Sequence, residues 1–189
     1  HLLGQRNPLA HEDPACLHGN FTKKRIPSGP DAGKTQHEVW LAKYHAMLNR
    51  ARKEPFVAHH IQQYGALPIW AAIELWDFGL LSKLFAGMKH ADQNEIARRY
   101  GAPNGRTFAQ WLRSLNFIRN ISAHHSRLWN RNIIDQPKLP PAAELPWVAA
   151  FEAHERSRAR CFLLLQITKH LLCVVNPRSS WPSRLGRLL

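Results

Sequence analysis

The chain has few cysteines, few acidic side chains and no long hydrophobic run. Only three of its 189 residues are cysteines, namely Cys16, Cys161 and Cys173. So small and odd a number argues against a disulfide framework, and we expect reduced thiols in a cytoplasmic protein. The longest apolar stretch, residues 161–175, is shorter than the roughly 20 residues of a membrane-spanning helix and contains Lys169 and His170. We therefore expect no membrane association.

Acidic residues are half as numerous as basic ones. The sequence has 13 Asp and Glu residues against 26 Lys and Arg residues, which gives a formal net charge of +13. Such an excess favours a polyanionic partner, and nucleic acid is the leading class. A protein that uses positive charge only to stay soluble would have the same composition. The charge therefore indicates a class of partner but no site.

Three familiar site patterns are absent or incomplete. Residues 29–35 resemble a phosphate-binding P-loop, but three residues separate the glycines where four are needed, and no strand precedes them. The histidine pairs 59–60 and 124–125 would point in different directions on a helix, and no paired Cys/His spacing indicates a closed zinc site. No Gly-x-Ser-x-Gly elbow is present. We expect neither a metal nor a cofactor.

What is present is helical periodicity, with Gly and Pro as punctuation. It predicts an all-α fold in a single domain over residues 1–189. The opening His1-Leu2-Leu3 leads us to expect that this domain is N-terminally incomplete. Two long loops are expected, a basic Gly/Pro-rich loop at 19–35 and a Pro-rich loop at 132–146. Asp92 is expected to cap a short helix. The helices are predicted at 1–18, 36–53, 56–64, 69–88, 92–100, 104–129 and 147–175.

The first loop carries four cations that suit phosphate contacts. They follow a pattern typical of either an RNA-binding loop or a mobile, solvated loop, and the sequence leaves both readings open. The four residues are Lys23, Lys24, Arg25 and Lys34.

The predicted helix over 104–129 carries an arginine and a histidine near its end. Arg119 and His124 are five residues apart, so their directions differ by about 140° on an ideal helix, whereas Asn120 and His124 share a face. A cation that holds a phosphate and an imidazole that moves a proton near neutral pH suit metal-independent RNA cleavage. Because one helix does not bring the two side chains together, we expect a distorted helix end or a second motif from a two-fold homodimer.

Arg119 falls on the apolar stripe that we predict for this helix. A buried arginine needs a partner, and Glu74, in the predicted central helix 69–88, is the candidate carboxylate. Alternatively, Arg119 extends to the surface and Glu74 is solvated.

These residues lie in recognisable motifs. Residues 117–131 (FIRNISAHHSRLWNR), together with 67–70 (LPIW) and 74–84 (ELWDFGLLSKL), resemble the signature of the bacterial Abi-like (AbiD/AbiF, abortive infection) family. Residues 179–185 (SSWPSRL) resemble a C-terminal pattern of the same family. The resemblance extends to the HEPN superfamily, whose all-helical bundles commonly form a composite ribonuclease site from an Arg-x4-6-His motif at a dimer interface.

The resemblance implies a phage-defence toxin that cleaves RNA by attack of a ribose 2′-OH, without a metal. The implied catalytic residues are Arg119, Asn120 and His124, the implied supporting residues are Glu74, His125 and Arg127, and Arg131 joins the basic loop as an RNA contact. The partners implied are RNA, a small-RNA antitoxin and a second copy of the chain. The alternative is a non-catalytic module that binds a structured or cognate small RNA.

Overall fold

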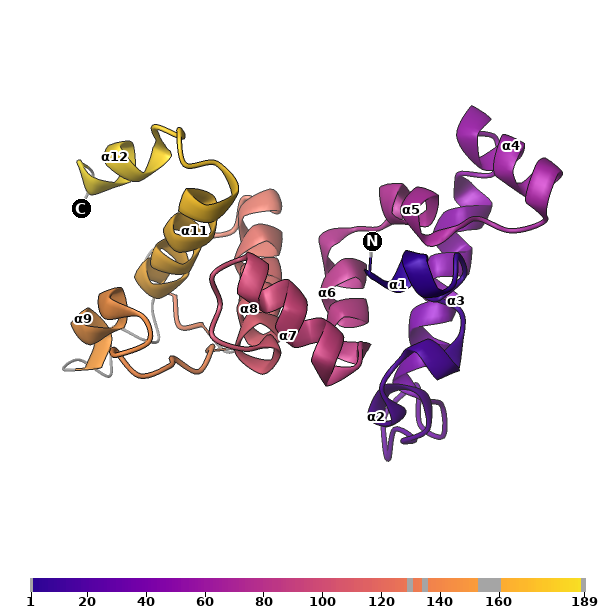
Figure 1. Cartoon of the computed structure of the whole chain (residues 1–189), viewed down its shortest axis with the longest axis horizontal. Coiled ribbons are helices and arrows are strands. Elements are labelled where there is room, and N and C mark those ends of the chain that lie inside the picture. The colour runs from indigo at the N-terminus through magenta and orange to yellow at the C-terminus, as the bar shows by residue number, and fades with distance from the viewer. Residues whose placement is uncertain (1, 129–130, 134–135, 153–160, 188–189) are drawn as a thin grey trace. The chain divides into compact units, whose positions relative to one another are not determined.

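The computed structural model describes residues 2–128, 131–133, 136–152 and 161–187 (Figure 1). Over these residues the chain forms α-helices and short 3-10 turns and has no strand, so the all-α prediction is confirmed. The chain divides into two compact units, residues 1–92 and 93–189. The predictions of one domain over 1–189 and of a HEPN-like bundle stay predictions.

The first unit begins with two short helices where one was expected over residues 1–18. Asn7 Oδ1 accepts a hydrogen bond from the Leu9 amide at 2.8 Å, and Asp13 accepts one from the Ala15 amide at 2.9 Å. Short polar side chains that bind nearby amides compete with the helix, which explains the interruption. The elements here are α1 (Leu2–Arg6), the 3-10 turn η1 (Pro14–Cys16) and α2 (Gly19–Thr22). The last of these occupies the start of the predicted loop 19–35.

Helix α3 (Gln36–Arg50) begins at the predicted residue, and α4 (Pro55–Tyr64) begins one residue before the predicted Phe56. Thr35 and Glu38 form a capping box, in which each side chain accepts a hydrogen bond from the other residue's amide, at 3.1 and 2.6 Å. Helix α4 starts on Pro55 and ends at Gly65, whose φ of 73° suits glycine. These boundaries follow from contacts between residues close in sequence. The end of α3 comes three residues before the predicted Lys53.

The prediction of a single helix over residues 69–88 is wrong. The chain forms α5 (Ile69–Ala72) and the 3-10 turn η2 (Ile73–Leu75), becomes extended at Trp76, and resumes as α6 (Phe78–Gly87). Asp77 causes the restart, because its Oδ1 accepts a hydrogen bond from the Leu80 amide at 2.6 Å. An aspartate in this role favours a new helix start over continuation of the old helix.

Helix α3 packs against α6 in the core of the first unit. The indole Nε1 of buried Trp40 donates a hydrogen bond to the Leu80 carbonyl at 2.9 Å. At the other end of α6, a Cβ added to Gly87 would overlap the Phe21 ring, so a glycine is needed for α2 to approach. The rest of the core includes Tyr44, Val57, Leu67, Ala72, Leu84, Phe85 and Met88.

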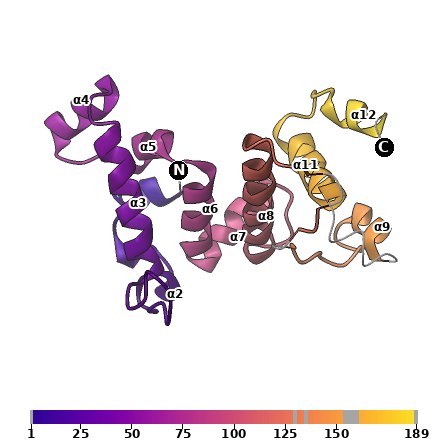
Figure 2. The same ribbon diagram turned by 180° about the vertical axis from the view of Figure 1, so that it is seen from behind.

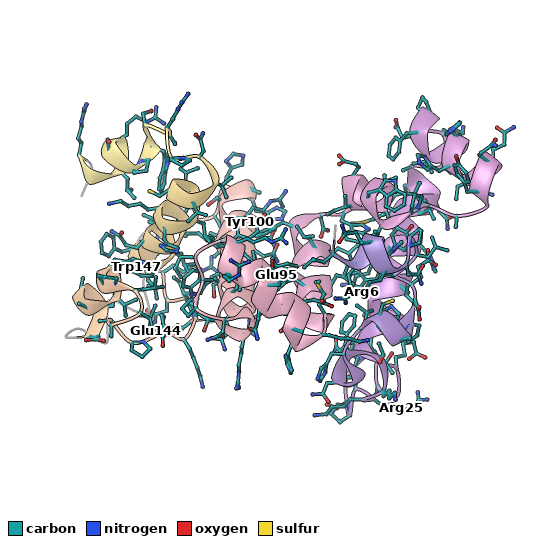
Figure 3. All side chains as sticks on the ribbon, viewed as in Figure 1. Arg6, Arg25, Glu95, Tyr100, Glu144 and Trp147 are labelled. Carbon is teal, nitrogen blue, oxygen red and sulfur yellow. The ribbon has the colours of Figure 1, made fainter. Side chains whose placement is uncertain are left out.

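Helix α7 (His90–Arg99) contains Asp92, which does not cap it as expected. The Asp92 carboxylate is buried and accepts two hydrogen bonds from the Arg6 guanidinium, at 2.6 and 2.7 Å. Paired hydrogen bonds of this kind are the strongest form of arginine–carboxylate contact. Asp92 thus ties α1 to the start of α7, and Figure 3 labels Arg6 at this point.

The second unit is built on α8 (Gly105–Ala123) and α11 (Cys161–Val175), which lie side by side (Figure 2). Phe108, Trp111 and Ser114 form the buried face of α8. On α11 the buried residues are Leu163, Leu164 and Ile167, and one turn later His170 Nε2 lies 2.9 Å from the Gly101 carbonyl oxygen. Three shorter elements complete the unit, namely η3 (Pro146–Val148), α9 (Ala149–Glu152) and α12 (Trp181–Gly186).

The Pro-rich segment 132–146 has no α-helix in its described residues, as predicted, and three of its side chains are buried. Ile133, Pro137 and Pro140 are buried, and the Lys138 amide donates to Gln110 Oε1 at 2.8 Å. The helix predicted over 147–175 is present at both ends, as η3 with α9 and as α11, while residues 153–160 lie outside the described residues. No helix in the described part of the chain is long and apolar enough to cross a membrane.

Candidate functional site

Helix α8 starts at the Asn104 cap and ends at Ala123, six residues before the predicted Trp129. Its end has two nested hydrogen bonds, from the His125 amide to the Ser122 carbonyl at 3.1 Å and from the Ser126 amide to the Ile121 carbonyl at 3.0 Å. This pair defines a Schellman motif with His124 as the helix cap. Trp129 and Asn130 lie outside the described residues.

His125 occupies the position in this motif that usually belongs to glycine. Its φ is 51°, which is the left-handed region, and it is the only non-glycine residue with a positive φ in the described part of the chain. A side chain in that region costs on the order of 1 kcal/mol. The chain therefore turns sharply at His124-His125, where the sequence predicted a continuous helix. Backbone strain of this kind is concentrated at functional sites, so we infer a functional role for this turn.

Arg119 is exposed, and the prediction that it faces the core is wrong. Its Nη1 donates a hydrogen bond to Asn120 Oδ1 at 3.1 Å, so these two motif residues contact each other on the surface. The buried line of α8 continues from Ser114 to Ile121. Arg119 is about 140° and 160° around the helix from these two residues, which places it on the opposite side from the core.

Glu74, the expected partner of Arg119, lies in the turn η2 and is exposed. It belongs to the first unit and Arg119 to the second, so their ion pair stays a prediction. The remaining residues predicted around the motif are also exposed, namely His124, His125, Arg127 and Arg131. The end of α8 thus presents two imidazoles and two further cations next to the Arg119–Asn120 pair in sequence.

The basic loop of the first unit has a defined backbone. The Ile26 amide donates to the Lys34 carbonyl at 2.8 Å and the Gly33 amide donates to the Ile26 carbonyl at 2.9 Å, which closes the loop like a hairpin. The Arg25 guanidinium donates to the Gly33 carbonyl, and Lys34 pairs with Asp31 at 3.0 Å. The predicted cations Lys23, Lys24, Arg25 and Lys34 are all exposed on this loop.

Two features of the first unit were missed by sequence reasoning. One is the ion pair of Arg6 with Asp92, which joins α1 to α7. The other is His11, which is fully buried among aromatic rings. No short-range pattern marks either, because each depends on elements far apart in sequence. In the described part of the chain, no three His, Cys, Asp or Glu side chains gather into a potential metal site.

The fold and the exposed motif define the class of this protein as an all-α protein with an Arg-Asn-x3-His sequence at a strained helix end. The chain belongs to the Abi-like protein family, whose model matches residues 1–130. That range includes the signature at 117–131 except for its last residue. The predicted family pattern at 179–185 lies beyond the matched range. Family membership points to abortive infection, a form of phage defence. No curated protein and no solved structure matches the chain.

Proposed function

We propose that this Abi-like protein is a metal-independent endoribonuclease of the HEPN type, acting as a toxin in phage defence. The observation that supports this most directly is the exposure of Arg119, Asn120 and His124 together at the end of α8. The adjacent His125 holds a strained left-handed backbone, and strain of this kind is concentrated at functional sites. The net charge of +13 suits an RNA substrate.

In the proposed reaction, His124 removes the proton from a ribose 2′-OH, and the resulting oxygen attacks the adjacent phosphorus. The bond from phosphorus to the 5′ oxygen breaks, that oxygen takes up a proton from water, and the protonated His124 gives its proton back to water. The products are a 2′,3′-cyclic phosphate and a 5′-hydroxyl end. Arg119 stabilises the charge that develops on the phosphate. Asn120, which accepts a hydrogen bond from Arg119, orients the guanidinium. His125 and Arg127 are proposed supporting residues, as is Glu74.

We further propose that the working site is composite and lies in a homodimer. Arg119 and His124 are five residues apart, so on one helix their side chains leave in directions that differ by about 140°, and one copy does not bring the cation and the imidazole to the same phosphate. A two-fold axis near the helix end would place two copies of the motif opposite each other. RNA as substrate, a small-RNA antitoxin and a cytoplasmic location belong to the same proposal.

A second candidate is a non-catalytic module that binds a structured or cognate small RNA. It is favoured by the exposed cations of the 19–35 loop, which need no catalytic histidine to hold phosphates. The two candidates can be distinguished by measuring whether RNA is cleaved and whether that cleavage requires His124.

The test incubates purified protein with labelled RNA in the presence of EDTA. We expect cleavage with cyclic-phosphate ends, no cleavage of DNA, and a fall in rate of about 10²–10⁴-fold for His124→Ala and for Arg119→Ala. Matched controls are His59→Ala and Arg106→Ala, which remove an exposed histidine and an exposed arginine elsewhere. Cleavage that survives both motif substitutions would refute the ribonuclease proposal. Tight RNA binding without any cleavage would support the second candidate.

A further inference from the structure

Helix α12 lines an open pocket in the second unit. The pocket has a volume of about 390 Å³, which lies within the roughly 300 to 1,000 Å³ of sites that bind small molecules. Its described lining consists of Trp181, Arg184, Leu185 and Arg187. The pocket thus combines a large aromatic ring, an aliphatic side chain and two guanidinium groups, and none of its described lining residues is acidic.

The order of these residues along α12 places them on one side of the helix. Arg184 and Leu185 follow Trp181 by three and four residues, which makes them its neighbours on the helix surface. Arg187 stands three residues beyond Arg184, so the second arginine continues the same side. Leu185 is buried, and both arginines are exposed. Helix α12, which packs against α11 (Figure 1), therefore presents two cations to solvent beside an apolar base.

The backbone of Trp181 is held in place on both sides. Its amide donates a hydrogen bond to Ser179 Oγ at 3.2 Å, and Pro182 follows it directly, which restricts the conformations of Trp181. The indole ring itself is partly exposed. Because the backbone is already fixed, a flat ligand that stacks on the ring needs to order little of the chain, and less entropy is lost on binding.

Arg184 and Arg187 form no ion pair with a carboxylate in the described part of the chain. Other exposed arginines of the second unit do so, since Arg98 and Arg99 contact Glu95 at 3.1 and 2.9 Å. Positive charge that no carboxylate offsets attracts an anion. Phosphate suits these two side chains, because the N–H groups of a guanidinium match phosphate oxygens in pairs.

We propose that the α12 pocket binds a nucleotide, with the base stacked on Trp181 and the phosphate held by Arg184 and Arg187. Every base has a π face, so stacking on an indole accepts any base and the pocket would hold RNA without selecting its sequence. The inference rests on the proposed function only in taking an RNA strand as the main source of the nucleotide, and it does not need cleavage. A free nucleotide has the same chemistry and is distinguished by experiment.

The first test measures binding of two probes by the full chain, a short single-stranded RNA and adenosine monophosphate. Trp181→Leu keeps an apolar side chain but removes the stacking surface, so affinity for RNA should fall about 5- to 100-fold, whereas Trp181→Phe should retain most of it. The matched control is Trp70→Leu, which removes a tryptophan that is 58% exposed in the first unit. Affinities of Trp181→Leu equal to those of the parent protein for both probes would overturn the proposal.

The second test measures the salt dependence of RNA binding over roughly 50 to 200 mM salt. Arg184→Gln and Arg187→Gln should each reduce the slope of log affinity against log salt by about 0.7, the contribution of one phosphate contact to a single strand. Arg178→Gln is the matched control, because it removes an exposed arginine just before α12 that does not line the pocket. Equal losses of slope in all three variants would contradict the proposed phosphate contacts. These arginines are exposed, so their variants stay informative if Trp181→Leu fails to fold.

Two comparisons identify the source of the nucleotide and separate the pocket from the nuclease. Adenosine monophosphate that binds as tightly as RNA, with equal sensitivity to Trp181→Leu, would make a free nucleotide the ligand and would support the pocket chemistry. Cleavage is then measured at saturating RNA, where a binding defect has little effect. Weaker binding with intact saturated cleavage supports the pocket as a binding site apart from catalysis. Trp181-dependent binding by a protein that never cleaves supports the pocket and refutes the nuclease.

Discussion

His11 is a fully buried histidine whose ring has aromatic neighbours. Its side chain has no exposure to solvent and is surrounded by the rings of Trp40, Tyr44 and Trp76, with centroids 5.0 to 6.2 Å away. Neither ring nitrogen forms a hydrogen bond with the described residues. The Glu12 carboxylate is 3.5 Å from Nε2, too distant to offset the lost water. Burial, followed by the nearby charges of His37 and His45, lowers the pKa of His11 to about 4.

This pKa makes the stability of the protein depend on pH. The unfolded chain binds a proton at His11 below about pH 6.5, whereas the folded chain does so only below about pH 4. The free energy of unfolding should therefore fall as pH drops from 6.5 to 4, by on the order of 3 kcal/mol. Urea unfolding at a series of pH values measures this fall, and His11→Phe should flatten it in this window.

A matched control for His11 is His59→Gln, which removes an exposed histidine of α4. That variant should keep the pH dependence of the parent protein. Carboxylates with lowered pKa values, such as Glu38 in the capping box, also lose stabilising charge in acid, but that loss begins near the ordinary carboxylate pKa of 4.5 and continues below it. A fall between pH 6.5 and about 5 that persists in His11→Phe would contradict our assignment.

Among the helices, those whose ends depend on neighbouring residues were predicted well. The start of α3 at the Thr35 cap and the span of α4 between Pro55 and Gly65 follow from local hydrogen bonds and backbone preferences. The predicted helix 69–88 failed because Asp77 caps a new helix in a stretch whose apolar pattern runs on without a break. Apolar periodicity indicates which face is buried but does not show where an internal cap takes over.

The left-handed backbone of His125 at the end of α8 has a measurable effect on stability. Because His125 adopts a left-handed conformation with φ of 51°, His125→Gly should relieve the strain and raise the free energy of unfolding by about 1 kcal/mol. His125→Val should lower it, since a β-branched side chain fits this region least well. Thermal unfolding of the three proteins, compared at equal concentration, measures the difference.

The neighbouring position provides the contrast for this experiment. His124 caps the helix with φ of −94°, where glycine brings no relief, so His124→Gly should lower stability or leave it unchanged. If His125→Gly were destabilising, the left-handed turn would not exist in solution. RNA cleavage by His125→Gly separates two roles, because a residue that only shapes the turn is replaceable by glycine, whereas an imidazole that takes part in chemistry is not.

For the whole molecule, the composite-site proposal makes a prediction about mixtures. If the site takes Arg119 from one protomer and His124 from its partner, Arg119→Ala and His124→Ala proteins should be inactive alone and partly active when mixed. The heterodimer then contains one intact arginine–histidine pair across the interface. RNA cleavage by each protein and by the mixture, after subunits have exchanged, measures this.

Analytical ultracentrifugation provides the control for that mixture. A homodimer must form for the rescue to be meaningful, and addition of RNA should not be required for it. A dimer whose mixed variants stay inactive would show that the site lies within one subunit or needs both copies of each residue. A protein that stays monomeric under conditions of full cleavage would refute the composite site.

Local chemistry along the chain was sufficient to predict an all-α protein, several helix starts and the motif at 119–124. Caps, prolines and helical periodicity act over four residues or fewer, so they can be read without knowing the fold. The Arg6–Asp92 pair and the burial of His11 could not be read in this way. Each depends on which distant helices pack together, and that choice is made by the burial of whole apolar faces. Arg119 shows the same limit, because the buried side of α8 was settled by its packing against α11.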